Sequence, residues 1–313
     1  MPLKRRPLPL PRPRPSTPPQ PPLIVVGRGN LGRSLTRALR AAGHRVTLVR
    51  ARTGIPKLAR RLESQPAALV LLTVPDGVIA SVATKLAAAG AAIPRSVAFV
   101  HLSGALGLGS LESLRDRHPV GSFHPLQSFP EPRPPEAFRG IVVAVDATTA
   151  SLRRRLGAMA RDIGARPRRV DESQRALYHA AAVFASNYLV ALLGEAVGLL
   201  EQAGWSEREA TAALVQLSEG VLLSVSRRGP TAGLTGPIRR GDVETVQRHL
   251  AALAEIDSAP GARKVARRTD LYRMLGSIAL EIAKEAGLEP AAAERVKRAL
   301  TRKVAATRRR RRS

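Results

Sequence analysis

The sequence predicts an α/β fold, in which a Rossmann-type, mostly parallel sheet is followed by an all-helical C-terminal domain. Up to residue 171, short apolar runs alternate with helical patterns, as in parallel strands joined by crossover helices. Beyond residue 171, apolar residues recur only at helical spacing. We therefore expect a disordered Pro- and Arg-rich tail (1–21), a Rossmann-like dinucleotide-binding domain (22–171), a helical substrate or dimerisation domain (172–306) and a basic tail (307–313).

A glycine-rich turn near the N-terminus is the strongest local pattern. The apolar run Leu23–Val26 leads into Gly-Arg-Gly-Asn-Leu-Gly, and a helical pattern and a second apolar run follow. This order is the context that the dinucleotide fingerprint requires. Gly27 allows the tight turn, Gly29 lets the backbone approach a diphosphate, and Gly32 lets helix and strand pack closely. A glycine-rich turn without a ligand is the alternative. The turn residues predicted to bind the cofactor are Gly27, Arg28, Gly29, Asn30, Leu31 and Gly32.

The residues after the second apolar run favour NADP over NAD. An NAD site usually has Asp or Glu there to bind the ribose 2′-hydroxyl, but the first acidic residue of this chain is Glu63. Arg50 and Arg52 follow the run instead, and Arg28 lies in the turn. A guanidinium can bind a 2′-phosphate through two parallel hydrogen bonds. The alternative is that these arginines belong to a generally basic surface.

Arginine dominates the charge of the chain. The net charge is +27, and 44 of the 51 basic residues are Arg. Such a skew is compositional rather than tuned to one partner, and ten of the charges lie in the two tails. We therefore expect no nucleic-acid partner beyond non-specific binding through the tails.

Other function classes have little support in the sequence. The chain has no cysteine, no H-E-x-x-H and no G-x-S-x-G, so thiol chemistry, a metal site and an α/β-hydrolase serine are not expected. No segment is interpreted as a signal peptide or a transmembrane helix. We expect a cytoplasmic protein without a membrane partner.

The remaining elements follow from the same periodicities. Residues 51–65 read as a short basic segment between two strands, and residues 229–241 as a Gly/Pro loop. Ser206 with Glu209 forms a capping-box pattern, and Asp242 is an N-cap candidate. Further strands are expected at 67–74, 96–101, 120–123, 141–145 and 166–170, and helices at 77–89, 110–115, 149–163, 171–202, 206–226, 243–255, 261–286 and 290–306.

Polar turns directly follow three of the predicted strands. Ligands of open parallel sheets bind outside the carboxyl ends of the strands, which selects Ser103 and His124 as possible substrate contacts. Asp76 follows one of these strands as well, and its alternative role is that of an N-cap for the next helix. The alternative for His124 is a structural histidine in a proline turn. The residues of these turns assigned to the cofactor are Val74, Pro75, Ser103 and Gly104.

The first helix of the C-terminal half carries polar groups among alanines. His179 and Ser186 are seven residues apart and share a face, with Asn187 beside them. Buried polar groups need partners, which a substrate or a neighbouring helix can supply. Lysine is missing between residues 86 and 263, so a lysine acid is impossible there and His179 or His124 is the expected proton donor. The predicted catalytic residues are His179, His124, Ser103 and Asn187. The Arg-containing loop at 233–242 is expected to face the site.

Together these segments resemble a family of oxidoreductases with a Rossmann-like N-terminal domain and a helical C-terminal domain of unknown function. That family is similar to pyrroline-carboxylate reductases, ketopantoate reductases and β-hydroxyacid dehydrogenases. The resemblance implies an NAD(P)-dependent reductase that forms a homodimer through its helical domain, but it names no substrate. The chain lacks the lysine that β-hydroxyacid dehydrogenases carry on the long helix. The segments that carry the resemblance are 27–32, 73–76, 103–105, 124–129, 178–188, 234–237 and 240–242.

The sequence thus favours an NADP-dependent oxidoreductase that transfers a hydride to a small, anionic carbonyl or imine substrate. A non-catalytic NADP-binding sensor or scaffold is the second hypothesis, because no lysine acid is available.

Overall fold

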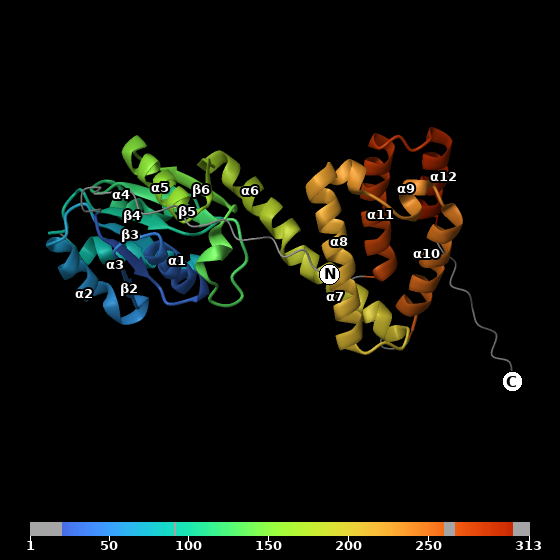
Figure 1. Ribbon diagram of the computed structural model, residues 1–313, viewed down its shortest axis with the longest axis horizontal. Helices are drawn as coiled ribbons and strands as arrows, with labels where there is room; N and C mark the ends of the chain where they lie inside the picture. The colour runs from blue at the N-terminus through green and yellow to red at the C-terminus, as the bar shows by residue number, and fades with distance from the viewer. Residues whose placement is uncertain (1–20, 91, 260–266, 303–313) are drawn as a thin grey trace. The chain divides into compact units, whose positions relative to one another are not determined.

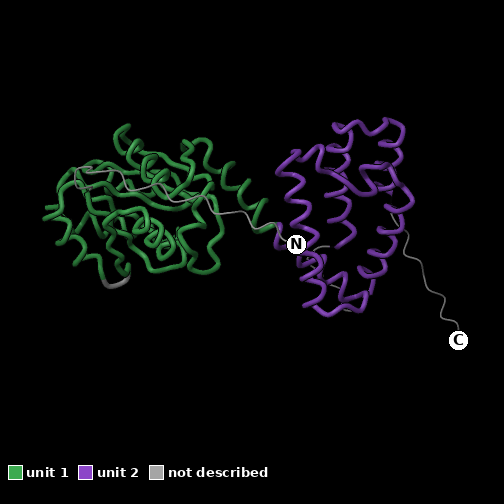
Figure 2. Tube along the Cα trace, viewed as in Figure 1, with its two compact units in different colours: residues 1–188 green, residues 189–313 purple. Residues whose placement is uncertain are grey.

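The structure is a computed structural model that describes residues 21–90, 92–259 and 267–302, without the side chains of Arg52 and Thr53. The chain divides into two compact units, residues 1–188 and residues 189–313 (Figure 2). The predicted boundary at residue 171 falls at the start of one helix, and this division falls shortly after the end of the same helix. Most of the two predicted tails, residues 1–20 and 307–313, lies outside the described residues.

The first unit is built on a seven-stranded sheet with the order β2-β1-β3-β4-β5-β6-β7 (Figure 1). Every neighbouring pair is parallel except β5 and β6, so the predicted mostly parallel sheet is confirmed. The strands are β1 (Leu23–Val26), β2 (Val46–Val49), β3 (Leu69–Leu72), β4 (Ala98–His101), β5 (Val120–Pro125), β6 (Val142–Ala147) and β7 (Arg166–Arg169).

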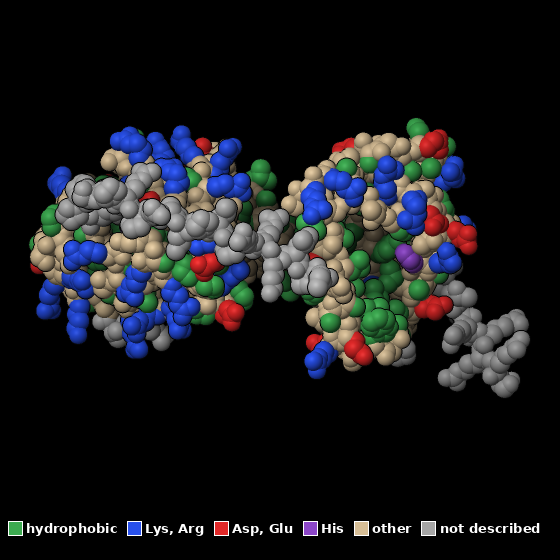
Figure 3. All heavy atoms as spheres, in the orientation of Figure 1, with side chains coloured by type: hydrophobic (Ala, Val, Ile, Leu, Met, Phe, Trp, Pro, Cys, Tyr) green, Lys and Arg blue, Asp and Glu red, His purple; other side chains and the backbone are tan. Residues whose placement is uncertain are grey.

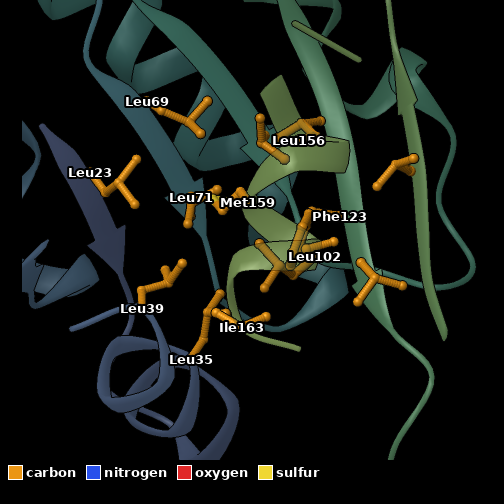
Figure 4. Close-up of a cluster of buried hydrophobic side chains, with 14 of the residues drawn as sticks. Leu23, Leu35, Leu39, Leu69, Leu71, Leu102, Phe123, Leu156, Met159 and Ile163 are labelled. Carbon is orange, nitrogen blue, oxygen red and sulfur yellow. The ribbon is translucent and has the colours of Figure 1, made fainter. Parts of the chain in front are cut away.

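Helices cover both faces of this sheet, which explains why its central strands are wholly apolar. Alternate residues of β1 enter different cores: Leu23 and Val25 pack in one cluster, and Ile24 and Val26 in the other. Figure 4 shows Met159 and Leu71 within the first cluster. The helical elements of this unit are α1 (Asn30–Ala41), α2 (Ala51–Glu63), α3 (Asp76–Ala89), η1 (Leu108–Leu111), α4 (Glu112–Arg115), η2 (Pro135–Phe138), α5 (Ala150–Asp162) and α6 (Glu172–Ala185).

The connection between β5 and β6 explains the reversed strand. It contains only the four-residue 3-10 turn η2, not a crossover helix. A parallel return usually runs through a crossover helix, and because none forms in this connection the chain turns back antiparallel instead. The same connection lies against α1: Asn30 Nδ2 donates to the carbonyls of Phe129 and Pro130 at 3.1 and 2.7 Å, and the Arg133 amide donates to Ser34 Oγ at 2.8 Å.

One predicted segment is wrong in this unit. Residues 51–65 read as a basic connection, but they form helix α2. Ile55, Leu58, Ala59 and Leu62 recur at helical spacing and are buried under the sheet. Pro56 inside the helix concealed that pattern.

The second unit is helical. Its core gathers on the last three long helices, with Val246, Leu250, Leu280 and Val296 buried together. The predicted caps are confirmed, since Ser206 and Glu209 form a reciprocal capping box and Asp242 accepts from the Thr245 amide. The helices are α7 (Asn187–Gln202), α8 (Glu207–Gly233), α9 (Pro237–Arg240), α10 (Val243–Asp257), α11 (Arg268–Glu285) and α12 (Pro290–Thr301).

Two predicted boundaries fail here. The single helix expected over 171–202 is interrupted at Ser186, whose φ and ψ of −126° and −74° separate α6 from α7. The loop expected over 229–241 contains the end of α8, bent at Gly229, and the short helix α9. Arg239 in this stretch donates to the carbonyl of Ala286 at 2.8 Å.

The stretch Glu172–Gln202 is long and apolar enough to cross a membrane by length and composition, with a mean hydropathy of 1.7. It is the one such stretch in the described residues. Its first half, however, carries Arg175, which is buried against the sheet of the first unit. We therefore interpret its apolar character as that of a protein surface.

Candidate functional site

The glycine-rich turn between β1 and α1 is crowded at two glycines and open at the third. Gly27 has a φ of +122°, and a Cβ there would lie 2.5 Å from the Thr73 carbonyl oxygen. A Cβ on Gly32 would collide with the Gly27 carbonyl and with Thr73 Oγ1. At Gly29 nothing lies within 4 Å of a Cβ position. The turn is therefore packed tightly at Gly27 and Gly32, whereas space remains beside Gly29.

The N-terminus of α1 beside this space is suited to an anion. Gly29 is the N-cap residue and has no side chain to cap the helix, and the first turn contains no acidic residue. The neighbouring Asn30 side chain is used elsewhere, on the carbonyls of Phe129 and Pro130. Uncapped amides at a helix N-terminus attract anions. The residues here therefore fit the diphosphate of a dinucleotide.

Two of the predicted arginines lie at the same end of the sheet. Arg28 is part of the turn, and Arg50 follows β2 as the N-cap residue of α2; both are exposed. The amide of Gly27 donates to the Val49 carbonyl at 3.0 Å, which holds the end of β2 beside the turn. Arg52 lies in α2, but its side chain is outside the described residues. Figure 3 shows other Lys and Arg side chains spread over the visible face of this unit, so a basic surface is not confined to the site.

The ends of β3 and β4 are tied together by a hydrogen bond between side chains. Ser103 Oγ donates to Asp76 Oδ2 at 2.6 Å and accepts from the amides of Ala105 and Leu106. Asp76 thus binds Ser103 and is not the N-cap of α3, which is Pro75. The hydroxyl of Ser103 is fully engaged, and its residue is only 5% exposed. Val74 is half-buried and Pro75 exposed beside this pair.

Two histidines from different elements converge on Gly104. His124 is near the end of β5, and His179 is in the middle of α6. A Cβ on Gly104 would lie 2.8 Å from His124 Nε2 and 2.8 Å from His179 Nδ1. Their ring centroids are 6.4 Å apart. Only glycine leaves room for this approach, so the structure brings together the three predicted residues Gly104, His124 and His179.

Tyr178 and Arg175 complete this cluster from α6. The Tyr178 hydroxyl lies 2.8 Å from His124 Nδ1, with the two rings edge to face. Arg175 is 2% exposed and donates to Ser122 Oγ at 2.6 Å and to the carbonyls of Val170 and Ser103. Its guanidinium is thus buried behind the histidines with neutral oxygens as hydrogen-bond partners.

Burial and the Arg175 charge determine the protonation of this cluster. Burial, and then the charges of His179 and Arg175, lower the pKa of His124 to about 4. Burial and Arg175 likewise lower the pKa of His101, at the end of β4, to about 4. Burial raises the pKa of Tyr178 to about 12. At neutral pH the side chains of His124 and His101 are therefore uncharged, and Tyr178 is a protonated phenol.

Some predicted residues are not part of this cluster. Asn187 is exposed at the start of α7, and its side-chain oxygen accepts from Ser186 Oγ at 2.9 Å. Ser186 Oγ also lies 2.7 Å from the Ala182 carbonyl, so its hydroxyl is used locally. Among the residues that the structure describes, no group of three metal-ligating side chains gathers anywhere.

The sequence pattern does not single out Tyr178, Arg175 or His101. Arg175 lies four residues before His179 and three before Tyr178, so all three share one face of α6. That spacing was the available signal. In a chain with 44 arginines, however, one more arginine on a helix is not distinctive.

Comparison with known proteins places two domains on this chain. Residues 17–125 match a model for a Rossmann-like domain, and residues 141–278 match the model of a domain of unknown function, DUF2520. The chain thus combines a Rossmann-like domain with a DUF2520 domain, as the sequence resemblance implied. No curated protein matches the chain.

Solved structures share this fold at low sequence identity. A putative NADP oxidoreductase from Bacteroides fragilis superposes with a TM-score of 0.63 at 22% identity, covering 85% of this chain and 98% of that one. An NADH-preferring ketol-acid reductoisomerase from an uncultured archaeon gives 0.56 at 15% identity, covering 88% and 82%. Pyrroline carboxylate reductase of Plasmodium falciparum, solved with NADP bound, gives 0.51 at 13% identity, covering 90% and 99%. These likenesses establish the architecture of the chain.

Proposed function

We propose that this protein is an NADP-dependent oxidoreductase that transfers a hydride to a small, anionic carbonyl or imine substrate. The observation that carries the proposal is the pairing of two features on the first unit. One is the uncapped N-terminus of α1 above the open Gly29. The other is the polar cluster around Gly104, at the end of β4 in the same sheet. Cofactors and substrates meet at this edge in open parallel sheets.

The cofactor residues are those of the glycine-rich turn and the neighbouring strand ends. The first-turn amides of α1 bind the diphosphate, and Arg50 and Arg52 bind the 2′-phosphate. When bound, NADPH supplies the hydride. Val74 and Pro75 after β3, and Ser103 and Gly104 after β4, form the surface beside the nicotinamide ribose.

Charge provides the test of NADP against NAD. Arg50→Ala should weaken NADP binding about tenfold, because one charge-assisted contact to the 2′-phosphate is lost, and leave NAD binding unchanged. Arg45→Ala is the matched control, since it removes an equal charge at the opposite end of β2. Isothermal titration with both coenzymes measures the effect. Equal or tighter NAD binding by the wild type rejects the NADP assignment.

Of the four residues predicted to act on the substrate, His124 and His179 carry the proposal. Ser103 acts by holding the end of β4 through its bond to Asp76, and Asn187 lies outside the cluster, at the start of α7. His124 is neutral at neutral pH, with a pKa of about 4, so it acts as a hydrogen-bond donor or a base and not as a charged acid. The buried charge of Arg175 acts on His124 and His101, which favours an anionic substrate in the same region. The proton that accompanies hydride transfer then passes through His179 or solvent.

Turnover is tested by NADPH oxidation with a panel of carbonyl and imine acids. His124→Gln and His179→Gln should each lower kcat/KM at least tenfold, while fluorescence titration shows unchanged NADPH affinity. Unchanged turnover in both variants would remove the roles given to the two histidines.

A non-catalytic NADP-binding sensor or scaffold is the second proposal. Two observations favour it: the Ser103 hydroxyl is fully engaged, and the low pKa of His124 leaves it uncharged at neutral pH. Tight NADP binding without turnover on the whole panel, together with a partner whose binding depends on NADP, is the result that selects this function.

We further propose that two copies associate through the helical domain as a homodimer. No residue of α7 is buried in the single chain, and Val190, Leu217, Leu222 and Ile278 are each more than half exposed. Most of the exposed large apolar side chains among the described residues lie in this unit, and extensive exposed apolar surface marks protein contacts. Leu217→Glu should convert a dimer to a monomer in light scattering, whereas Glu219→Gln should not. A wild-type monomer at micromolar concentration rejects the proposal.

We place the protein in the cytoplasm, with nucleic acid bound only non-specifically through the tails. Deleting residues 1–21 and 307–313 should abolish oligonucleotide binding and leave NADP binding intact. Retained oligonucleotide binding would move that contact to the folded domains.

A further inference from the structure

A pair of aromatic rings in the candidate site has a geometry that the proposed function does not use. The Tyr178 hydroxyl lies 2.8 Å from Nδ1 of His124, and the ring centroids are 5.6 Å apart at 89°. His124 is neutral at neutral pH and carries one N–H, so this contact decides which nitrogen holds the proton.

The hydroxyl hydrogen of Tyr178 decides the direction of that hydrogen bond. Among the described residues, His124 Nδ1 is the one hydrogen-bond partner of this hydroxyl, and a partly buried O–H group without an acceptor costs more than an unused lone pair on its oxygen. Tyr178 therefore donates, and Nδ1 of His124 accepts.

The opposite nitrogen of His124 consequently carries the proton. Nε2 faces Gly104, where His179 Nδ1 also lies, each 2.8 Å from the position of a Cβ. The two nitrogens are thus no further apart than twice that distance, within reach of one shared oxygen atom. His179 Nδ1 is buried, and it has no hydrogen-bond partner in the part of the chain that the structure describes.

We propose that Tyr178 is a positioning residue that holds His124 with its proton on Nε2, so that His124 Nε2–H and the unpartnered His179 Nδ1 form a donor–acceptor pair for a substrate hydroxyl. A hydroxyl can accept from the first nitrogen and donate to the second, whereas a protonated amine or imine cannot accept. The inference rests on the proposed function for the identity of the ligand. It assigns the substrate to the carbonyl–alcohol class and not to the imine–amine class.

The chain offers a matched control in its second unit. His249 Nδ1 lies 2.9 Å from the Tyr272 hydroxyl, with ring centroids 5.7 Å apart at 87°. This pair has nearly the same geometry but is exposed and belongs to α10 and α11. A change at His124 that follows loss of Tyr178 but not of Tyr272 is therefore specific to the site.

The test is 15N NMR of labelled histidines in the full-length protein without coenzyme, at about pH 8, above the ordinary histidine pKa. The His124 and His179 signals are assigned from their Gln variants. In the wild type we expect His124 protonated on Nε2 and His179 unprotonated on Nδ1. Tyr178→Phe should redistribute the His124 proton between both nitrogens, and Tyr272→Phe should change only His249.

A wild-type His124 that carries its proton on Nδ1 overturns the positioning role, whether or not Tyr178→Phe folds. An unchanged His124 in a folded Tyr178→Phe variant also overturns it. A wild-type His179 protonated on Nδ1 overturns the hydroxyl assignment. Because coenzyme is absent, a protein that fails to bind NADP would reject the proposed function and leave these results interpretable.

Discussion

The two units of this chain bury their polar groups very differently. At the carboxyl edge of the first unit's sheet, His101, Ser122 and Arg175 are almost fully buried. Among the described residues of the second unit, Thr269 alone is a buried polar side chain. The second unit instead exposes large apolar side chains along α7 and α8, such as Val190 and Leu217. Burying these polar groups costs the first unit folding stability, as is common at functional sites. The second unit instead leaves an apolar surface exposed to solvent.

This difference indicates where a mutation acts. In the first unit a small change at the sheet edge alters packed backbone or buried charge, with consequences for both folding and chemistry. In the second unit comparable changes are local and tolerated unless they touch a partner. The following experiments test that contrast at matched positions.

The largest effect is expected at Gly32. A Cβ there meets the Gly27 carbonyl and Thr73 Oγ1, and the Thr73 hydroxyl is held by the carbonyls of Val26 and Gly27. Gly32→Ala should cost about 3 kcal/mol of unfolding free energy, because backbone must move. Urea unfolding followed by circular dichroism measures it.

Gly229→Ala is the control in the second unit. Gly229 has a φ of +77° but open space around it, so the substitution should cost only about 1 kcal/mol through its backbone conformation. If the two variants lose equal stability, the first unit is not more tightly constrained than the second.

Next in size is the buried guanidinium. Arg175→Met leaves Ser122 Oγ and the Val170 carbonyl without their donor and should cost about 3 kcal/mol. Arg268→Met breaks the partly exposed pair with Glu195 at 2.9 Å and should cost about 1 kcal/mol. Chemical unfolding of both variants gives the ratio, and a larger loss in Arg268→Met would reverse the contrast.

The sequence predicts the elements whose patterns are complete in themselves. The apolar runs that become β1, β3 and β4 and the fingerprint at 27–32 needed no tertiary information. Helix α2 was concealed because Pro56 interrupts its pattern, and burial of Ile55 and Leu62 by the sheet overrides that signal. The break at Ser186 depends on where two units meet along the chain, which periodicity does not encode.

The candidate site divides in the same way. The rule that ligands lie beyond strand ends selected Ser103 and His124, and also Gly104, which directly follows Ser103. Arg175 and Tyr178 enter the cluster from α6, and their contribution depends on packing between distant segments. Asn187 shares the helical pattern but not the cluster, because the helix is interrupted before it.

A smaller effect is the pH dependence of stability. The pKa of His101 is lowered from 6.5 to about 4 in the folded chain, so the unfolded chain binds more protons between these values. The contribution of His101 to the free energy of unfolding is fully present above the pKa of the unfolded chain. About 1–3 kcal/mol of it is lost as the pH falls from that value to the pKa of the folded chain. His101→Phe should flatten the decline in unfolding free energy between those pH values, with stability measured in urea at each pH.

The exposed histidine of the second unit is the comparison. His249→Phe removes a side chain that pairs with Tyr272 at the surface, and the pH slope of this variant is measured in parallel. A slope that flattens in His249→Phe and persists in His101→Phe would place the acid sensitivity in the helical unit.

The smallest effects should be equal in the two units, because helix caps act locally. Thr149 accepts from the Leu152 amide at the start of α5, and Ser206 accepts from the Glu209 amide at the start of α8. Thr149→Ala and Ser206→Ala should each cost about 1 kcal/mol. Ser206 has the reciprocal Glu209 bond at 3.1 Å to its own amide, which survives the substitution. Equal losses in thermal unfolding would show that the units differ in tertiary burial alone. A loss confined to Thr149→Ala would mean that the remaining bond from the residue 206 amide to Glu209 caps α8 by itself.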